Sequence, residues 1–132
     1  MVRQGSSAKI AKITGENIFK INSSGNFVNS SIVLTGTVNH TNISAWKYYN
    51  PTSANADSSG YVVYPNSGTN TTLTVNSTDA PVVAANGNSG TGSIKIKLVT
   101  TDNNTYDIFT ITILKDGVNA QSSIAAVLSN EV

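Results

Sequence analysis

The chain contains no cysteine and only one histidine and one methionine in its 132 residues. Without cysteine, neither a disulfide nor a thiolate metal site can form. Charged residues make up only 11% of the sequence, against roughly 25% in an average soluble protein. The 8 Lys and Arg residues nearly balance the 7 Asp and Glu residues, which leaves a net charge of +1. This balance argues against nucleic acid as a partner, because nucleic-acid-binding proteins normally show a strongly basic face.

The few titratable residues also argue against catalysis and metal binding. The acidic residues are scattered, and the Asp-x-Asp-x-Asp-Gly spacing of a calcium loop is absent. No spacing indicates the pair of facing carboxylates that glycoside hydrolysis requires. His40 stands alone in a polar Asn-His-Thr stretch and is expected to be an exposed turn residue. We therefore predict no enzymatic activity, no cofactor and no metal. No apolar run approaches the ~20 residues of a membrane span, so no membrane partner is expected either.

What the sequence does contain is an excess of small polar residues: Asn, Ser and Thr account for 50 of the 132 residues. These side chains compete for backbone hydrogen bonds and so disfavour helix. Thr, together with the many Val and Ile residues, favours strands. Disorder is the alternative interpretation of such a composition. The 39% hydrophobic content, arranged in alternating runs, is too high for a disordered chain.

Alternating apolar and polar residues predict about eight short strands. The expected strands cover residues 8–14, 18–21, 31–38, 43–49, 61–64, 71–75, 93–100 and 106–114. The last two are separated by an Asp-Asn-Asn turn and are expected to pair as an antiparallel hairpin. A short edge element is expected over residues 82–84, and polar loops over 50–60 and 86–92. This pattern is typical of a β-sandwich or barrel.

A small core is expected around Trp46, the only tryptophan, whose ring buries ~150–250 Å² when it points inward. The other core candidates are apolar or aromatic residues on one face of their strands. They are Tyr48, Ile94, Ile96, Phe109 and Ile111. Lys95 and Lys97 fall on the opposite, outward face, where lysines are typical of an edge strand protected against aggregation.

Three motifs together resemble a known class of domain. They are SIVLTGTV followed by WKYYN, the segment TTLTVNSTDA, and the hairpin KLVTTDNNTYDIFTITILKDG. Residues 32–117, which cover all but the first residue of these motifs, resemble the immunoglobulin-like domains inserted in tail-tip and tail-fibre proteins of bacteriophages and prophages. The sequence departs from that pattern after Tyr49, where the loop 50–60 replaces the aromatic-Gly-aromatic return of many such modules.

The resemblance implies an all-β, antiparallel immunoglobulin-like β-sandwich over residues 8–117. Residues 1–7 are then an N-terminal tail or cloning remnant, and residues 118–132 a linker and the start of a following module. The implied function is non-enzymatic: a spacer or host-attachment module of a virion tail protein. Its partners would be neighbouring domains of a longer chain, in an assembly that can be oligomeric. Bacterial cell-surface polysaccharide is a further candidate partner.

The alternative is a dedicated carbohydrate-binding module of a bacterial surface adhesin or of a wall-degrading enzyme. Because aromatic rings stack on sugars, the candidate glycan-contacting residues are Tyr49, Tyr61 and Tyr64. A structural role for each of the three is the competing interpretation. An exposed strip of aromatic rings would distinguish the carbohydrate-binding module from a spacer, which does not require one.

Overall fold

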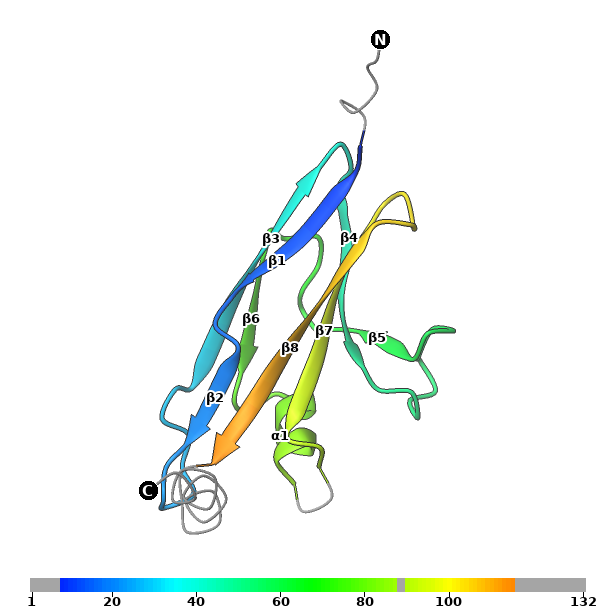
Figure 1. Ribbon diagram of the computed structural model, residues 1–132. Helices are drawn as coiled ribbons and strands as arrows, with labels where there is room; N and C mark the ends of the chain where they lie inside the picture. Colours follow the sequence, from blue (N-terminus) through cyan, green and yellow to red (C-terminus); the bar gives the residue numbers. More distant parts are fainter. Residues whose placement is uncertain (1–7, 88–89, 116–132) are drawn as a thin grey trace, which may run out of the picture.

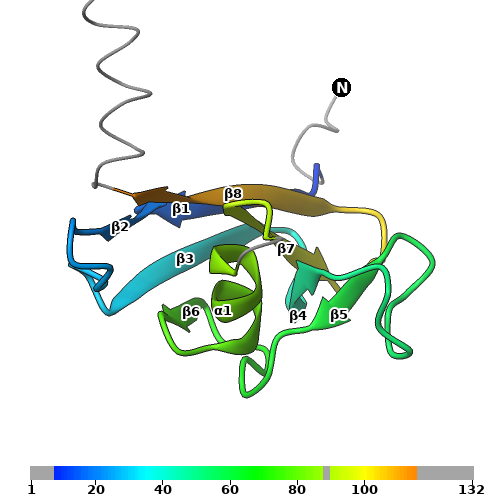
Figure 2. The same cartoon turned by 90° about the horizontal axis from the view of Figure 1, so that it is seen from below.

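The computed structural model describes residues 8–87 and 90–115. These residues form two β-sheets packed face to face, with one short helix at one end (Figures 1 and 2). The first sheet has the strand order β1 (Ile10–Gly15), β3 (Ser31–Asn39), β6 (Thr72–Asn76). The second has the order β2 (Ile18–Ile21), β8 (Tyr106–Lys115), β7 (Ser93–Thr100), β4 (Ile43–Tyr49), β5 (Tyr61–Val63). The prediction of an all-β fold is confirmed.

The alternation in the sequence places apolar side chains between the sheets. In β3, Ile32 and Leu34 are buried while the residues between them are exposed. In β7, Ile94, Ile96 and Leu98 are buried in the same alternating way. Of the remaining core candidates, Trp46 and Ile111 are fully buried, whereas Tyr48 and Phe109 are half-buried and pack against the core.

Trp46 occupies the centre of the core because the opposite strand makes room for it. Its Nε1 donates a hydrogen bond to the backbone oxygen of Asn70 over 2.8 Å. Gly36 of β3 faces the ring, and a Cβ added there would lie 2.9 Å from both Trp46 Cζ2 and Leu98 Cδ2. The absence of a side chain at position 36 therefore allows the largest side chain of the protein to be buried.

The predicted hairpin forms between β7 and β8, which pair antiparallel from Ser93–Thr112 to Val99–Tyr106. Its turn is held by the carboxylate of Asp102. Oδ1 of Asp102 accepts hydrogen bonds from the backbone N–H groups of Asn104 and Thr105. These hydrogen bonds hold the pKa of Asp102 well below its usual value.

Two elements differ from the prediction. Strand β2 runs parallel to β8, although all pairings were expected to be antiparallel. The chain passes from the first sheet to the second between β1 and β2, and Gly15 at this crossing has φ +148°, which favours glycine. Residues 82–84, expected as an edge element, belong instead to helix α1 (Ala80–Asn86), which has Pro81 in its first turn. The segments predicted as a tail (1–7) and a linker (118–132) lie outside the described residues.

Candidate functional site

The structure places the three candidate tyrosines in different environments. Tyr49, at the end of β4, has 47% of its surface exposed. Tyr61, at the start of β5, is only 6% exposed. The two residues are partners in the β4–β5 register, and their ring centroids lie 5.2 Å apart in an edge-on arrangement. This pair lies on the outer face of the second sheet.

Tyr64 is part of the core, so the prediction that its ring contacts a glycan is wrong. It is only 2% exposed, and its hydroxyl donates a 2.5 Å hydrogen bond to Asp79 Oδ2. Its ring meets Tyr48 edge-on at 5.5 Å. Burial, reinforced by the Asp79 carboxylate, raises the pKa of Tyr64 well above its usual value. The side chain points inward because residues 61 and 64 fall on opposite sides of an extended chain, and the backbone N–H of Tyr64 donates a 2.8 Å hydrogen bond to the backbone oxygen of the buried Trp46.

A cavity of about 350 Å³ opens beside Tyr64, between β6, the loop after β5 and the start of α1. Its lining is mainly amide and hydroxyl side chains, including Ser67, Asn70 and Thr74. Asp79, also in the lining, accepts hydrogen bonds from Tyr64 and from the backbone N–H of Asn76. These contacts give Asp79 a structural role, joining β5, β6 and α1.

Lys95 and Lys97 do not belong to an edge strand, as the sequence suggested. Strand β7 lies inside the second sheet, between β8 and β4, so both neighbours already satisfy its backbone. The two lysines project outward from the middle of the sheet, because Ile94, Ile96 and Leu98 occupy its inner face. Protection against edge-to-edge pairing therefore does not explain them.

Both lysines instead lie over tyrosine rings. Lys95 Nζ is 5.6 Å from the ring centroid of Tyr49. Lys97 Nζ is 5.0 Å from the centroid of Tyr61 and 4.6 Å from that of Tyr106. These distances are within the ~6 Å range of cation–π attraction. We call these five residues the tyrosine–lysine face.

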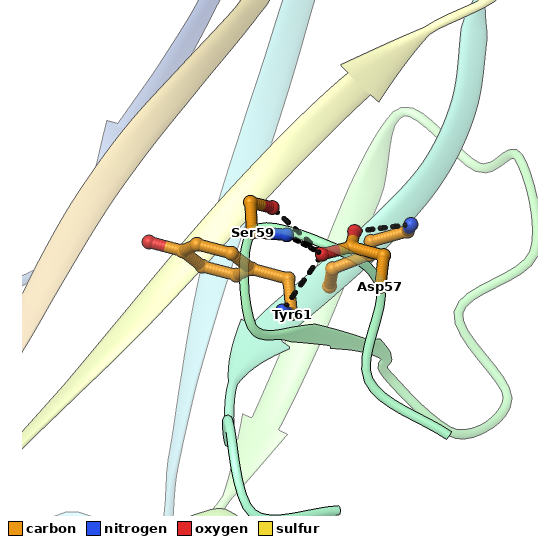
Figure 3. A network of polar contacts seen from close by, with 4 residues as sticks. Asp57, Ser59 and Tyr61 are labelled. Carbon is orange, nitrogen blue, oxygen red and sulfur yellow. Dashed lines mark hydrogen bonds and ion pairs between the residues drawn. The ribbon is translucent and has the colours of Figure 1, made fainter. Parts of the chain in front are cut away.

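An ion pair at the margin of this face fixes the position of Tyr61 (Figure 3). Asp57 Oδ2 lies 2.8 Å from Lys47 Nζ. Asp57 Oδ1 accepts hydrogen bonds from the backbone N–H and hydroxyl of Ser59 and from the backbone N–H of Tyr61. The Lys47 ammonium and these donors hold the pKa of Asp57 well below its usual value. Asp57 thereby closes the loop between β4 and β5 and orients the Tyr61 ring across the sheet.

Burial, with smaller contributions from Tyr49 and Asp57, raises the pKa of Tyr61 above its usual value. The Tyr61 ring is therefore a neutral platform beneath Lys97 at physiological pH. Tyr49 and Tyr106 border it, and Tyr106 is 55% exposed. The face thus offers two accessible aromatic rings and two ammonium groups on adjoining strands.

Tyr106 was not identified from the sequence, although a signal was available. The alternation over residues 106–114 places Tyr106 on the outward side of β8, together with Ile108 and Thr110. The hairpin register then sets Tyr106 opposite Val99, two residues from Lys97. The alternation along β8 and the position of the hairpin turn would together have predicted that Tyr106 lies close to Lys97.

The other titratable residues have structural roles or lie exposed. Asp107 Oδ2 accepts a 2.7 Å hydrogen bond from the backbone N–H of Ile13, which joins β8 to β1 of the other sheet. His40 is exposed, with φ 61°, between β3 and β4. Within residues 8–87 and 90–115, no three His, Asp or Glu residues gather in a way that could hold a metal ion. The helix of this part of the chain is too short to cross a membrane.

No protein-family model, curated protein or solved structure matches the chain.

Proposed function

We propose that the chain is a non-enzymatic immunoglobulin-like module that acts as a spacer in a longer phage or prophage tail protein. The strand order supports the immunoglobulin-like part of the proposal. If β1, β3, β4 and β5 are strands A, B, C and C′, and β6, β7 and β8 are E, F and G, the first sheet is A-B-E and the second is G-F-C-C′ with β2 added beside G. That is the order of the immunoglobulin sandwich without strand D. Trp46 is then the buried tryptophan of strand C.

The observation that carries the spacer role is the path of the chain. In Figure 1, β1 begins at one end of the sandwich and β8 finishes at the other. Strands β1 and β2 follow each other in the same direction along this axis, so residues 8–21 cover about 43 Å at ~3.3 Å per residue. A module entered at one end and left at the other adds its full length to the distance between its neighbours.

Contacts between the sheets support rigidity along this axis. The Ile13–Asp107 hydrogen bond connects the first sheet to β8. The β2–β8 pairing lets one continuous N-terminal segment belong to both sheets. A spacer benefits from such connections because they resist sliding of one sheet over the other.

Attachment to surface polysaccharide is the second part of the proposal. Tyr49 and Tyr106 support it, since both have accessible rings on one face. An isolated module would bind weakly, and repetition in an oligomeric tail would raise the effective affinity. A dedicated carbohydrate-binding module of a bacterial surface protein is the alternative that the same rings favour.

In-frame deletion of residues 8–115 from the parent gene tests the spacer role in assembled particles. We expect the particles to assemble with the part beyond the deletion drawn in by about 43 Å in cryo-electron micrographs. An antibody against the chain should label purified particles. Labelling confined to the bacterial envelope would refute the tail-protein assignment and favour the surface-protein alternative. Particles of unchanged length would refute the spacer role.

A further inference from the structure

The tyrosine–lysine face carries positive charge that no neighbouring acid balances among residues 8–87 and 90–115. Lys47, on β4, has the Asp57 carboxylate 2.8 Å away. In the part of the chain that the structure describes, neither Lys95 nor Lys97 lies within 4.0 Å of a carboxylate oxygen. Their ammonium groups rest on tyrosine rings instead. An anionic group arriving from solvent would therefore meet cations that are positioned but not neutralised.

The surroundings of these lysines are those that a sugar polymer requires. The rings of Tyr49 and Tyr106 can pack against the C–H faces of sugars. Beside them, Thr110 and Thr112 project outward and exposed from β8, opposite Lys95 and Ser93. Their hydroxyls can donate to and accept from sugar hydroxyls. Residues two apart on a strand are separated by ~6.6 Å, so Lys95 and Lys97 can contact charges on successive parts of one polymer.

Two other occupants fit less well. A second copy of the chain docked through the same face would bring lysine against lysine, which is unfavourable. Single-stranded nucleic acid depends on many phosphate contacts for its affinity, whereas this face, as far as the structure describes the chain, offers the two cations Lys95 and Lys97, and the net charge of the whole chain is +1.

We propose that the tyrosine–lysine face binds carboxylate-bearing polysaccharide, with Lys95 and Lys97 pairing with the carboxylates and Tyr49 and Tyr106 packing on the sugar rings. The inference rests on the attachment part of the proposed function and names its site and ligand class. The proposed binding site is the outer face of the second sheet, where these four side chains lie.

Binding is measured by biolayer interferometry with the whole chain displayed at high density through an N-terminal tag. The principal probe is polygalacturonate. Its fully methyl-esterified form keeps the sugar and removes the charge, polyglutamate keeps the charge without the sugar, and an oligothymidylate tests nucleic acid. We expect binding to polygalacturonate at least tenfold tighter than to the other three probes, and weaker binding as salt is raised.

Three variants assign the site. The double variant K95Q/K97Q should weaken polygalacturonate binding about tenfold, and Y106S should weaken it several-fold. The matched control K9Q/K12Q removes the same charge from the β1 region, where both side chains are exposed, and should change binding less than twofold. Circular dichroism melting curves check that each variant folds.

Several outcomes would overturn the inference: no binding to polygalacturonate, equal binding to polyglutamate or to the methyl ester, tighter binding to oligothymidylate, or an equal loss in K9Q/K12Q. None of these outcomes would affect the spacer role, because particle length after deletion is independent of this face.

Discussion

Replacing Gly36 by alanine tests how the core accommodates Trp46. The new Cβ would lie 2.9 Å from Trp46 Cζ2, 3.1 Å from Trp46 Cη2 and 2.9 Å from Leu98 Cδ2. Real Cβ atoms almost never approach other heavy atoms this closely, so one of the neighbours must move. Both neighbours are fully buried, and neither can move without disturbing further core contacts.

The size of the effect follows from two opposing terms. Overpacking a well-packed core typically costs ~1–3 kcal/mol. Alanine also restricts the unfolded chain more than glycine does, which returns ~0.4–1 kcal/mol. We therefore expect Gly36→Ala to lower the free energy of unfolding by about 1–2 kcal/mol.

Urea denaturation followed by tryptophan fluorescence measures this change, and the only tryptophan, Trp46, is itself at the perturbed site. Gly87→Ala is a suitable control. The nearest atom to a Cβ at Gly87 is Ala84 O at 3.5 Å, and φ is −70°, so its stability should be unchanged or slightly higher. An unchanged unfolding free energy for Gly36→Ala would refute the proposed packing of Trp46 against β3.

Two further substitutions test the polar contacts. Tyr64→Phe removes the hydroxyl that donates to Asp79 and should lower the free energy of unfolding by about 1–2 kcal/mol. Tyr106→Phe removes a hydroxyl from an exposed ring and is the control. It should leave the free energy of unfolding unchanged in the same urea titration. Asp57→Asn removes the charge that pairs with Lys47 and should reduce the dependence of stability on acid pH. The folded-state pKa of Asp57 is lowered, so its contribution is present above the unfolded pKa of ~3.9 and declines below it. Unfolding free energies at pH 7, 4 and 2.5 measure this, and equal pH dependence in the wild type and Asp57→Asn would contradict the assigned ion pair.

The strands were predictable because their alternation is strong and local. Ile94, Ile96 and Leu98 alternate with polar residues over a full strand, and the following Asp102 turn fixes the hairpin. The burial of Trp46 was predictable because it is a large aromatic side chain and the only tryptophan of the sequence. These features depend on residues close together in the sequence, where period and turn chemistry are sufficient evidence.

The remaining features depend on which strands become neighbours. Nothing local shows that β7 is an interior strand, so Lys95 and Lys97 were interpreted as edge protection. Tyr64 was named as a candidate glycan contact beside a structural role, because nothing local shows that it lies against Trp46 and Asp79. Helix α1 has only seven residues and includes Val82 and Val83, whose β-branched side chains favour strands. Two turns of helix are too few to establish a period of 3.6 residues.

The measurement that tests the spacer geometry most directly is the distance between the two ends of the sandwich. Because the chain has no natural cysteine, spin labels can be placed only at Ala8→Cys and Lys115→Cys. Lys115 is the register partner of Ile21, so double electron–electron resonance should give a single narrow distribution centred at about 43 Å. A distribution below about 20 Å, or one as broad as that of the urea-unfolded chain, would contradict a rigid module that is entered at one end and left at the other.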